Sequence, residues 1–222
     1  HFVKQYPLVG DKQNYILPYV LSPDAIAYEV DTQLKQELVT KFQVKADEQI
    51  IFFGGAFKKT GGVPDLISAF SKLKNDFSNA RLFLLGDGPN MPECKGLVDK
   101  LNLGDKVVFI GRTPYHHLRT YQDLATVIVC PDKQNVYSEL IVHVKYLDAL
   151  ISGKLVVNGS FKSVMEINPN EFLSLTFQPS DVKDLAEVLQ KTLSNRTVFE
   201  EKYNLKIKLN NENFNNYSCL QQ

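Results

Sequence analysis

The chain has 222 residues, of which 44% are hydrophobic and 23% are charged, as in an ordinary globular protein that can bury a sizeable core. Lysine plus arginine and aspartate plus glutamate both number 25, so the formal net charge is zero. This balance argues against a general nucleic-acid binder and against a membrane-surface binder, because both classes usually carry a basic excess.

Short apolar runs alternate with amphipathic stretches along most of the chain. Residues 1–14 look like the tail of a preceding element, and the chain starts at His1 rather than Met, so we expect a further N-terminal part upstream. Continuous apolar runs are typical of parallel strands that are covered on both faces. The predicted strands are Ile50–Phe53, Ala80–Leu85, Lys106–Ile110, Thr126–Cys130 and Lys154–Val157. The predicted helices are Pro64–Phe77, Met91–Leu101, Tyr115–Leu124, Ser138–Ile151 and Asp181–Leu193.

The alternation of strands and helices predicts an α/β fold, a Rossmann-like doubly wound parallel sheet. Ligands bind such a sheet at the carboxyl ends of its strands. The loops at those ends are Gly54–Gly62, Gly86–Pro89, Gly111–Pro114, Pro131–Glu139 and Asn158–Ser163. Three of the five begin with glycine, where the backbone can approach a ligand closely. From Phe199 to Gln222 the chain is rich in Asn and Lys and predicts a C-terminal helix or a tail.

The three cysteines, Cys94, Cys130 and Cys219, are far apart and form no CxxC pair. We therefore expect neither a disulfide framework nor a zinc site, and we expect a reducing, cytoplasmic location.

The order of motifs resembles the C-terminal domain of family-4 retaining glycosyltransferases, which is the C-terminal half of a GT-B fold. The matching stretches are Ile50–Phe70 (IIFFGGAFKKTGGVPDLISAF), Ala80–Pro89 (ARLFLLGDGP), Leu101–Pro114 (LNLGDKVVFIGRTP), Leu118–Pro131 (LRTYQDLATVIVCP) and Asp148–Val157 (DALISGKLVV). Tyr15–Ser22 (YILPYVLS) stands where this family enters its second domain. The resemblance thus divides the chain into a residual linker over 1–14, a nucleotide-sugar-binding domain over 15–198 and the C-terminal segment 199–222.

The resemblance implies a donor site for a nucleotide diphosphate sugar, which faces an acceptor-binding domain upstream of this chain. It implies no metal and no cofactor apart from the donor substrate. Any association with a membrane would come through the upstream domain, and this fragment alone should be inactive. A helix N-terminus with free N–H groups at the strand ends would suit the diphosphate.

Family members usually hold the diphosphate with an Arg and a Lys, but here these two positions read Ala56 and Gly61. Lys58 and Lys59 lie in the same glycine-rich loop as Gly55 and could replace them; the alternative is that both are solvated surface lysines. Lys145 is another replacement, because some GT-B enzymes carry a lysine three residues before the ribose carboxylate. The alternative for Lys145 is a local ion pair with Asp148.

Family members also place two glutamates eight positions apart, one near the sugar and one on the ribose hydroxyls. The second position is Asp148, whose carboxylate can accept from two hydroxyls; the alternative is a solvated helix carboxylate. The first position falls on Leu140, with Glu139 beside it. Glu139 can meet the sugar only if the helix begins at or after it, because a shift of one residue turns a helical side chain by about 100°.

In the resembled family the loop after the third strand holds the base, largely through its backbone, and here that loop contains Arg112 and Thr113. Two other functions remain open. The altered Arg, Lys and Glu positions fit a degenerate GT-B domain that serves as a structural or partner-binding subunit. A different nucleotide-sugar enzyme on the same fold, such as an epimerase, is the third alternative.

Overall fold

The computed structural model describes residues 29–203. The segments 1–14, Tyr15–Ser22 and 204–222, for which the sequence predicts a linker, a domain entry and the end of a helix or tail, lie outside the described residues. Residues 196–203 are helical. In the described part, no helix is long and apolar enough to span a membrane.

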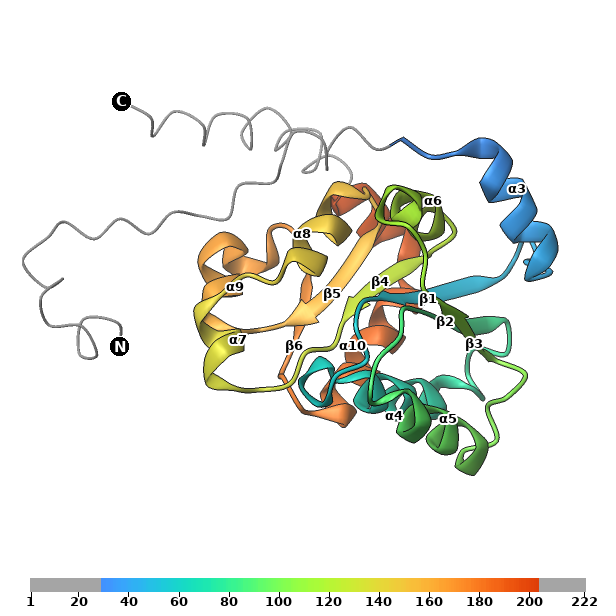
Figure 1. The fold of residues 1–222 in the computed structure, drawn as a ribbon. Coiled ribbons are helices and arrows are strands. Elements are labelled where there is room, and N and C mark those ends of the chain that lie inside the picture. Colours follow the sequence, from blue (N-terminus) through green and yellow to red (C-terminus); the bar gives the residue numbers. More distant parts are fainter. Residues whose placement is uncertain (1–28, 204–222) are drawn as a thin grey trace, which may run out of the picture.

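Six parallel strands form one sheet in the order β3-β2-β1-β4-β5-β6 (Figure 1). Their bounds are β1 Gln49–Gly54, β2 Ala80–Leu85, β3 Val107–Gly111, β4 Val127–Cys130, β5 Leu155–Gly159 and β6 Leu175–Phe177. This is the strand order of a Rossmann fold, so the predicted doubly wound parallel sheet is confirmed. The sixth strand is an addition to the five that the sequence predicts.

Helices cover both faces of this sheet (Figure 1). One face packs against α4 (Val63–Leu73), α5 (Met91–Lys100) and α10 (Val182–Ser194). The other packs against α3 (Thr32–Lys41), α6 (Leu118–Asp123), α8 (Val144–Ile151) and α9 (Lys162–Ile167). The short helix α7 (Val136–Leu140) packs against α9. Three single-turn 3₁₀ helices complete the described chain: η2 Lys59–Gly61, η3 Tyr115–His117 and η4 Pro169–Glu171.

Alternation along each strand divides the core in two. Ile51 and Phe53 of β1 face α4 and α10, whereas Ile50 and Phe52 face the opposite helix layer. All four side chains are at most 1% exposed. Because successive side chains of a strand point to opposite faces, a run of apolar residues is what a sheet covered on both sides requires.

One predicted helix, Ser138–Ile151, is wrong as a continuous element. The structure divides it into α7 and α8, and Ile141 between them has extended backbone angles, with φ −128° and ψ 148°. The Ser163 hydroxyl donates to the carbonyl of Ile141, over 2.8 Å, and lies 3.3 Å from that of Ser138. A side chain of α9 thus satisfies carbonyls that a continuous helix would bond internally.

Candidate functional site

Backbone hydrogen bonds join the loops that leave the carboxyl ends of β1, β2 and β3. The Gly55 amide donates to the Leu85 carbonyl over 3.0 Å, and the Phe57 amide donates to the Asp87 carbonyl over 3.0 Å. The Gly86 amide then donates to the carbonyl of Gly111 over 2.8 Å. These bonds continue the sheet pairing past the ends of the strands. They hold the backbones of the three loops side by side.

Glycine is required at two points where loops touch. Gly62, at φ +63°, would place a Cβ 1.6 Å from the carbonyl oxygen of Pro131. Gly86, at φ +127°, would place a Cβ 1.9 Å from the carbonyl oxygen of Gly55. Both residues combine a backbone conformation that favours glycine with a backbone contact that excludes any side chain. The loops after β1, β2 and β4 therefore meet closely at this edge.

Lys145, in the first turn of α8, reaches this edge of the sheet. Its Nζ lies 2.7 Å from Oδ1 of Asp132, which follows β4, and 5.5 Å from the centroid of the Phe53 ring. Its Cδ lies 3.8 Å from the position that a Cβ on Gly55 would take. The structure thus brings together Lys145 and Gly55, two of the predicted diphosphate ligands. The ion pair is made with Asp132 and not locally with Asp148.

Lys58 and Lys59 lie in the loop after β1 with exposed side chains. Lys58 precedes the 3₁₀ helix η2, and its carbonyl accepts from the Gly61 amide over 2.9 Å. Within residues 29–203 neither ammonium group forms an ion pair. Both cations are therefore available at the edge that Gly55 and Lys145 share.

Asp148 lies one turn after Lys145 on α8 and accepts a hydrogen bond of 2.6 Å from the hydroxyl of Tyr115 in η3. It therefore stands beside the loop that follows β3, where Arg112 and Thr113 lie. Burial raises the pKa of Asp148 above its ordinary value, and the hydrogen bond from Tyr115 partly opposes that rise.

In that loop, Arg112 Nε lies 3.4 Å from Oδ2 of Asp87, and the two side chains are 80% and 47% exposed. An ion pair this exposed contributes little to stability, so the guanidinium can turn to another partner. Thr113 is half-buried.

Glu139 is committed to protein partners on both of its oxygens. Oε2 accepts from the backbone amide of Lys162, the first residue of α9, over 2.9 Å, and Oε1 accepts from the Gln134 amide group. The hydrogen bond from the Lys162 amide, followed by that from Gln134, lowers the pKa of Glu139. Glu139 lies inside α7, which begins at Val136, whereas the helix that carries Asp148, α8, begins at Val144, after Glu139. The sugar role of Glu139 stays a prediction.

Two residues at this edge were missed from the sequence: Asp132 and Tyr115. Asp132 is a polar residue directly after Pro131 at the end of a buried strand, and that position is the signal that could have found it. Tyr115 offers no comparable signal, because its contact with Asp148 joins residues 33 positions apart.

A polar network holds the segment between β4 and α8. Asn135 caps α7, accepting from the Ser138 amide over 2.9 Å and donating from its own amide group to the Ser138 hydroxyl, also over 2.9 Å. His143 Nε2 lies 3.1 Å from the same hydroxyl. Burial, together with the charge of Lys145, lowers the pKa of His143 and outweighs the opposing charge of Asp132. Ser138 is 1% exposed, so this Ser–His contact has a structural role.

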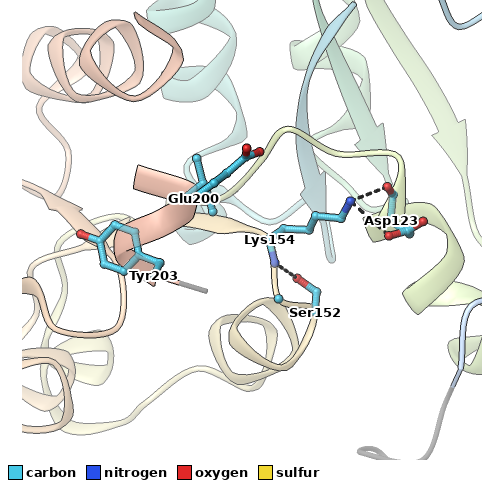
Figure 2. Close-up of a pocket in the computed structure, with 7 residues that line it drawn as sticks. Asp123, Ser152, Lys154, Glu200 and Tyr203 are labelled. Atoms are coloured by element: carbon cyan, nitrogen blue, oxygen red, sulfur yellow. Dashed lines mark hydrogen bonds and ion pairs between the residues drawn. The ribbon is translucent and has the colours of Figure 1, made fainter. Parts of the chain in front are cut away.

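A cavity of about 370 Å³ lies at the opposite end of the sheet, where β4 and β5 begin (Figure 2). Its lining residues are Asp123, Ser152, Gly153, Lys154, Leu155, Glu200 and Tyr203. Lys154 Nζ lies 3.1 Å from Oδ1 of Asp123, and Lys35 Nζ lies 2.6 Å from Oδ2. Asp123 and Lys154 of this cavity therefore pair with each other, and it contains none of the predicted site residues.

Residues 35–213 match the family model described as glycosyl transferases group 1, which is most of the chain. The chain belongs to this family. Among the relatives of this chain is an uncharacterized glycosyltransferase of Methanocaldococcus jannaschii, 28% identical over 171 residues, which are 75% of this chain and 42% of that protein.

Solved structures share the fold of this chain. Sucrose-phosphate synthase from Thermosynechococcus elongatus aligns with a TM-score of 0.69 at 19% identity, over 94% of this chain and 51% of that one. Anabaena HepE, in complex with UDP-glucose, aligns with a TM-score of 0.67 at 15% identity, over 88% of this chain and 52% of that one. The group 1 chain thus spans about half the length of these solved chains.

Proposed function

We propose that this chain is the donor-binding, C-terminal domain of a retaining GT-B glycosyltransferase, which transfers a sugar from a nucleotide diphosphate sugar to a hydroxyl acceptor. One observation carries the proposal: Lys145 and Asp148, one turn apart on α8, reach the end of β1 and the loop after β3 respectively. A cation and a carboxylate at that spacing suit the diphosphate and the ribose of one nucleotide. The fold likeness to HepE, which was solved with UDP-glucose, supports the same ligand class.

Each site residue then has a defined task. Lys145, with Lys58 or Lys59 from the loop after β1, contacts the diphosphate as a point charge, while Gly55 lets the backbone approach it. Asp148 accepts from the ribose hydroxyls after Tyr115 releases it. The loop of Arg112 and Thr113 receives the base, and Glu139 contacts the sugar once its bonds to Lys162 and Gln134 are released. The acceptor site belongs to an upstream domain, so we expect no transfer by this fragment alone.

We place the protein in the cytoplasm. Cys94 and Cys130 are unpaired and buried. Burial raises the pKa of Cys94 to about 11 and that of Cys130 to about 12, so both thiols stay protonated and unreactive. Such cysteines fit a reducing compartment.

The test compares UDP with uridine, each titrated calorimetrically into the parent chain and into Lys145→Met. We expect the variant to bind UDP about tenfold more weakly, because one charge-assisted contact to a phosphate is worth about 1.5–3 kcal/mol and the neighbouring lysines compensate in part. Uridine, which lacks the phosphates, should bind both proteins equally. The control is Lys154→Met, since Lys154 is also a half-buried, paired lysine but lies at the far end of the sheet.

A parent chain that binds no nucleoside diphosphate at millimolar concentration would overturn the proposal. The degenerate, partner-binding domain would then be the better conclusion. One observation favours that second candidate: four of the predicted ligand residues already bond to other protein groups. These residues are Lys145, Asp148, Arg112 and Glu139.

A further inference from the structure

The Asp132 carboxylate pairs with Lys145 in a largely buried position, and only one of its two oxygens has a partner among the described residues. The Asp132 side chain is 6% exposed and that of Lys145 is 21% exposed. Oδ1 of Asp132 lies 2.7 Å from the ammonium group, but Oδ2 is buried and has no hydrogen-bond partner among the described residues. Buried carboxylate oxygens are normally satisfied, so Lys145 is the main compensation for this charge.

This pairing changes what an incoming diphosphate would meet. A carboxylate at this separation opposes part of the attraction that the ammonium group exerts on a ligand in contact with it, so Lys145 attracts a phosphate less strongly while it is paired with Asp132. The other acid–base pairs near this edge differ. Arg112 and Asp87 are largely exposed, and the Lys133 side chain, 3.1 Å from Asp65, is 38% exposed. Solvent screens those pairs, whereas it screens the pair of Asp132 and Lys145 much less.

We infer that Asp132 competes with the diphosphate for Lys145 and thereby sets the affinity of the site for that ligand. The inference rests on the proposed function, because it takes Lys145 as a diphosphate ligand. Asp132 acts through Lys145 and needs no contact with the nucleotide. When the phosphates bind, the ammonium group shares its hydrogen bonds between them and the carboxylate, and the carboxylate draws part of its charge away.

The test removes the charge of Asp132 and keeps its shape. In Asp132→Asn the amide oxygen still accepts from Lys145, but the cation is no longer neutralised. We expect UDP to bind this variant about tenfold more tightly than the parent, and uridine to bind both equally. In the double variant with Lys145→Met, the gain should disappear. Asp123→Asn, which removes a lysine-paired carboxylate at the far end of the sheet, should leave UDP affinity unchanged.

The outcomes separate this inference from the proposed function. If the parent binds UDP and Asp132→Asn binds it equally or more weakly, the function stands and the competition is refuted. If only the variant binds UDP, the competition stands, and Asp132 prevents UDP from binding to the parent chain. If neither binds, both fail. Should Asp132→Asn not fold, as judged by circular dichroism, Asp132→Ser removes the same charge in a smaller side chain and takes its place.

Discussion

Two aspartates at opposite ends of the sheet have opposite electrostatic environments. Burial raises the pKa of Asp148, and the single hydrogen bond from Tyr115 does not offset it. Burial also acts on Asp123, but the hydrogen bonds and charges of Lys35 and Lys154 outweigh it and lower the pKa of Asp123. A raised carboxyl pKa means that ionisation costs stability once the pH exceeds the ordinary value of 3.8. A lowered pKa means that ionisation adds stability, which is lost as the pH falls through the folded value.

We therefore expect Asp148→Asn to be more stable than the parent chain at pH 7. The gain should be at most about 1 kcal/mol, because solvent screens a half-buried carboxylate, and should raise the melting temperature by roughly 2–4 °C. It should vanish at about pH 3, where Asp148 is protonated in both the folded and the unfolded chain. Asp123→Asn should instead be less stable at pH 7. Thermal unfolding at both pH values tests this pair, and a loss of stability in Asp148→Asn at pH 7 would contradict it.

At the scale of the elements, backbone contacts between the loops contribute more to stability than the side chains of those loops. Gly86→Ala should destabilise the fold by more than about 2 kcal/mol, because its Cβ would overlap the Gly55 carbonyl at an unfavourable φ. Gly96→Ala is the matched control: Gly96 lies inside α5 with open space around it, so alanine should stabilise by about 0.5–1 kcal/mol. Urea unfolding measures both. Equal effects of the two substitutions would show that the loops can separate at little cost.

The five longer strands could be predicted from the sequence because their signal is local: each is a run of apolar side chains between turn residues. β6 has only three residues, Leu175–Phe177, too few for a pattern. Helix α3 buries Leu38 alone, so its sequence carries almost no periodicity. The break at Ile141 is stabilised by Ser163, 22 residues away, and no local pattern reports it.

The candidate site also has features that the sequence predicts locally and features that depend on the folded structure. The spacing of Lys145 and Asp148 on one helix is a local property, and the sequence predicts it. Their partners, Asp132 and Tyr115, approach only after the sheet has formed and helices have packed across it. Partner choice in a packed site depends on tertiary distances, which side-chain spacing along the chain does not contain.

At the scale of the whole molecule, one sheet separates two apolar cores. Phe70 on α4 belongs to one core and Phe83 on β2 to the other, and both side chains are fully buried. Because each strand contributes to both cores, we expect Phe70→Ala and Phe83→Ala each to cost about 3–5 kcal/mol and to lower one common unfolding transition. Urea unfolding followed by circular dichroism and by tyrosine fluorescence checks this. Val198→Ala, at an exposed position, should change the free energy of unfolding by less than about 0.5 kcal/mol. Two separated transitions in either core variant would show that the cores unfold independently.

The position of β1 between β2 and β4 also orders events during synthesis. Ile51 pairs with Leu82, 31 residues later, and with Val127, 76 residues later. Closing the longer loop costs about 0.8 kcal/mol more chain entropy, and the residues of β4 leave the ribosome after those of β2 and β3. A half-sheet of β1, β2 and β3 can thus form first, with one edge of β1 still unpaired. Until β4 arrives, that apolar edge is the part of the nascent chain most open to mispairing and to chaperone binding.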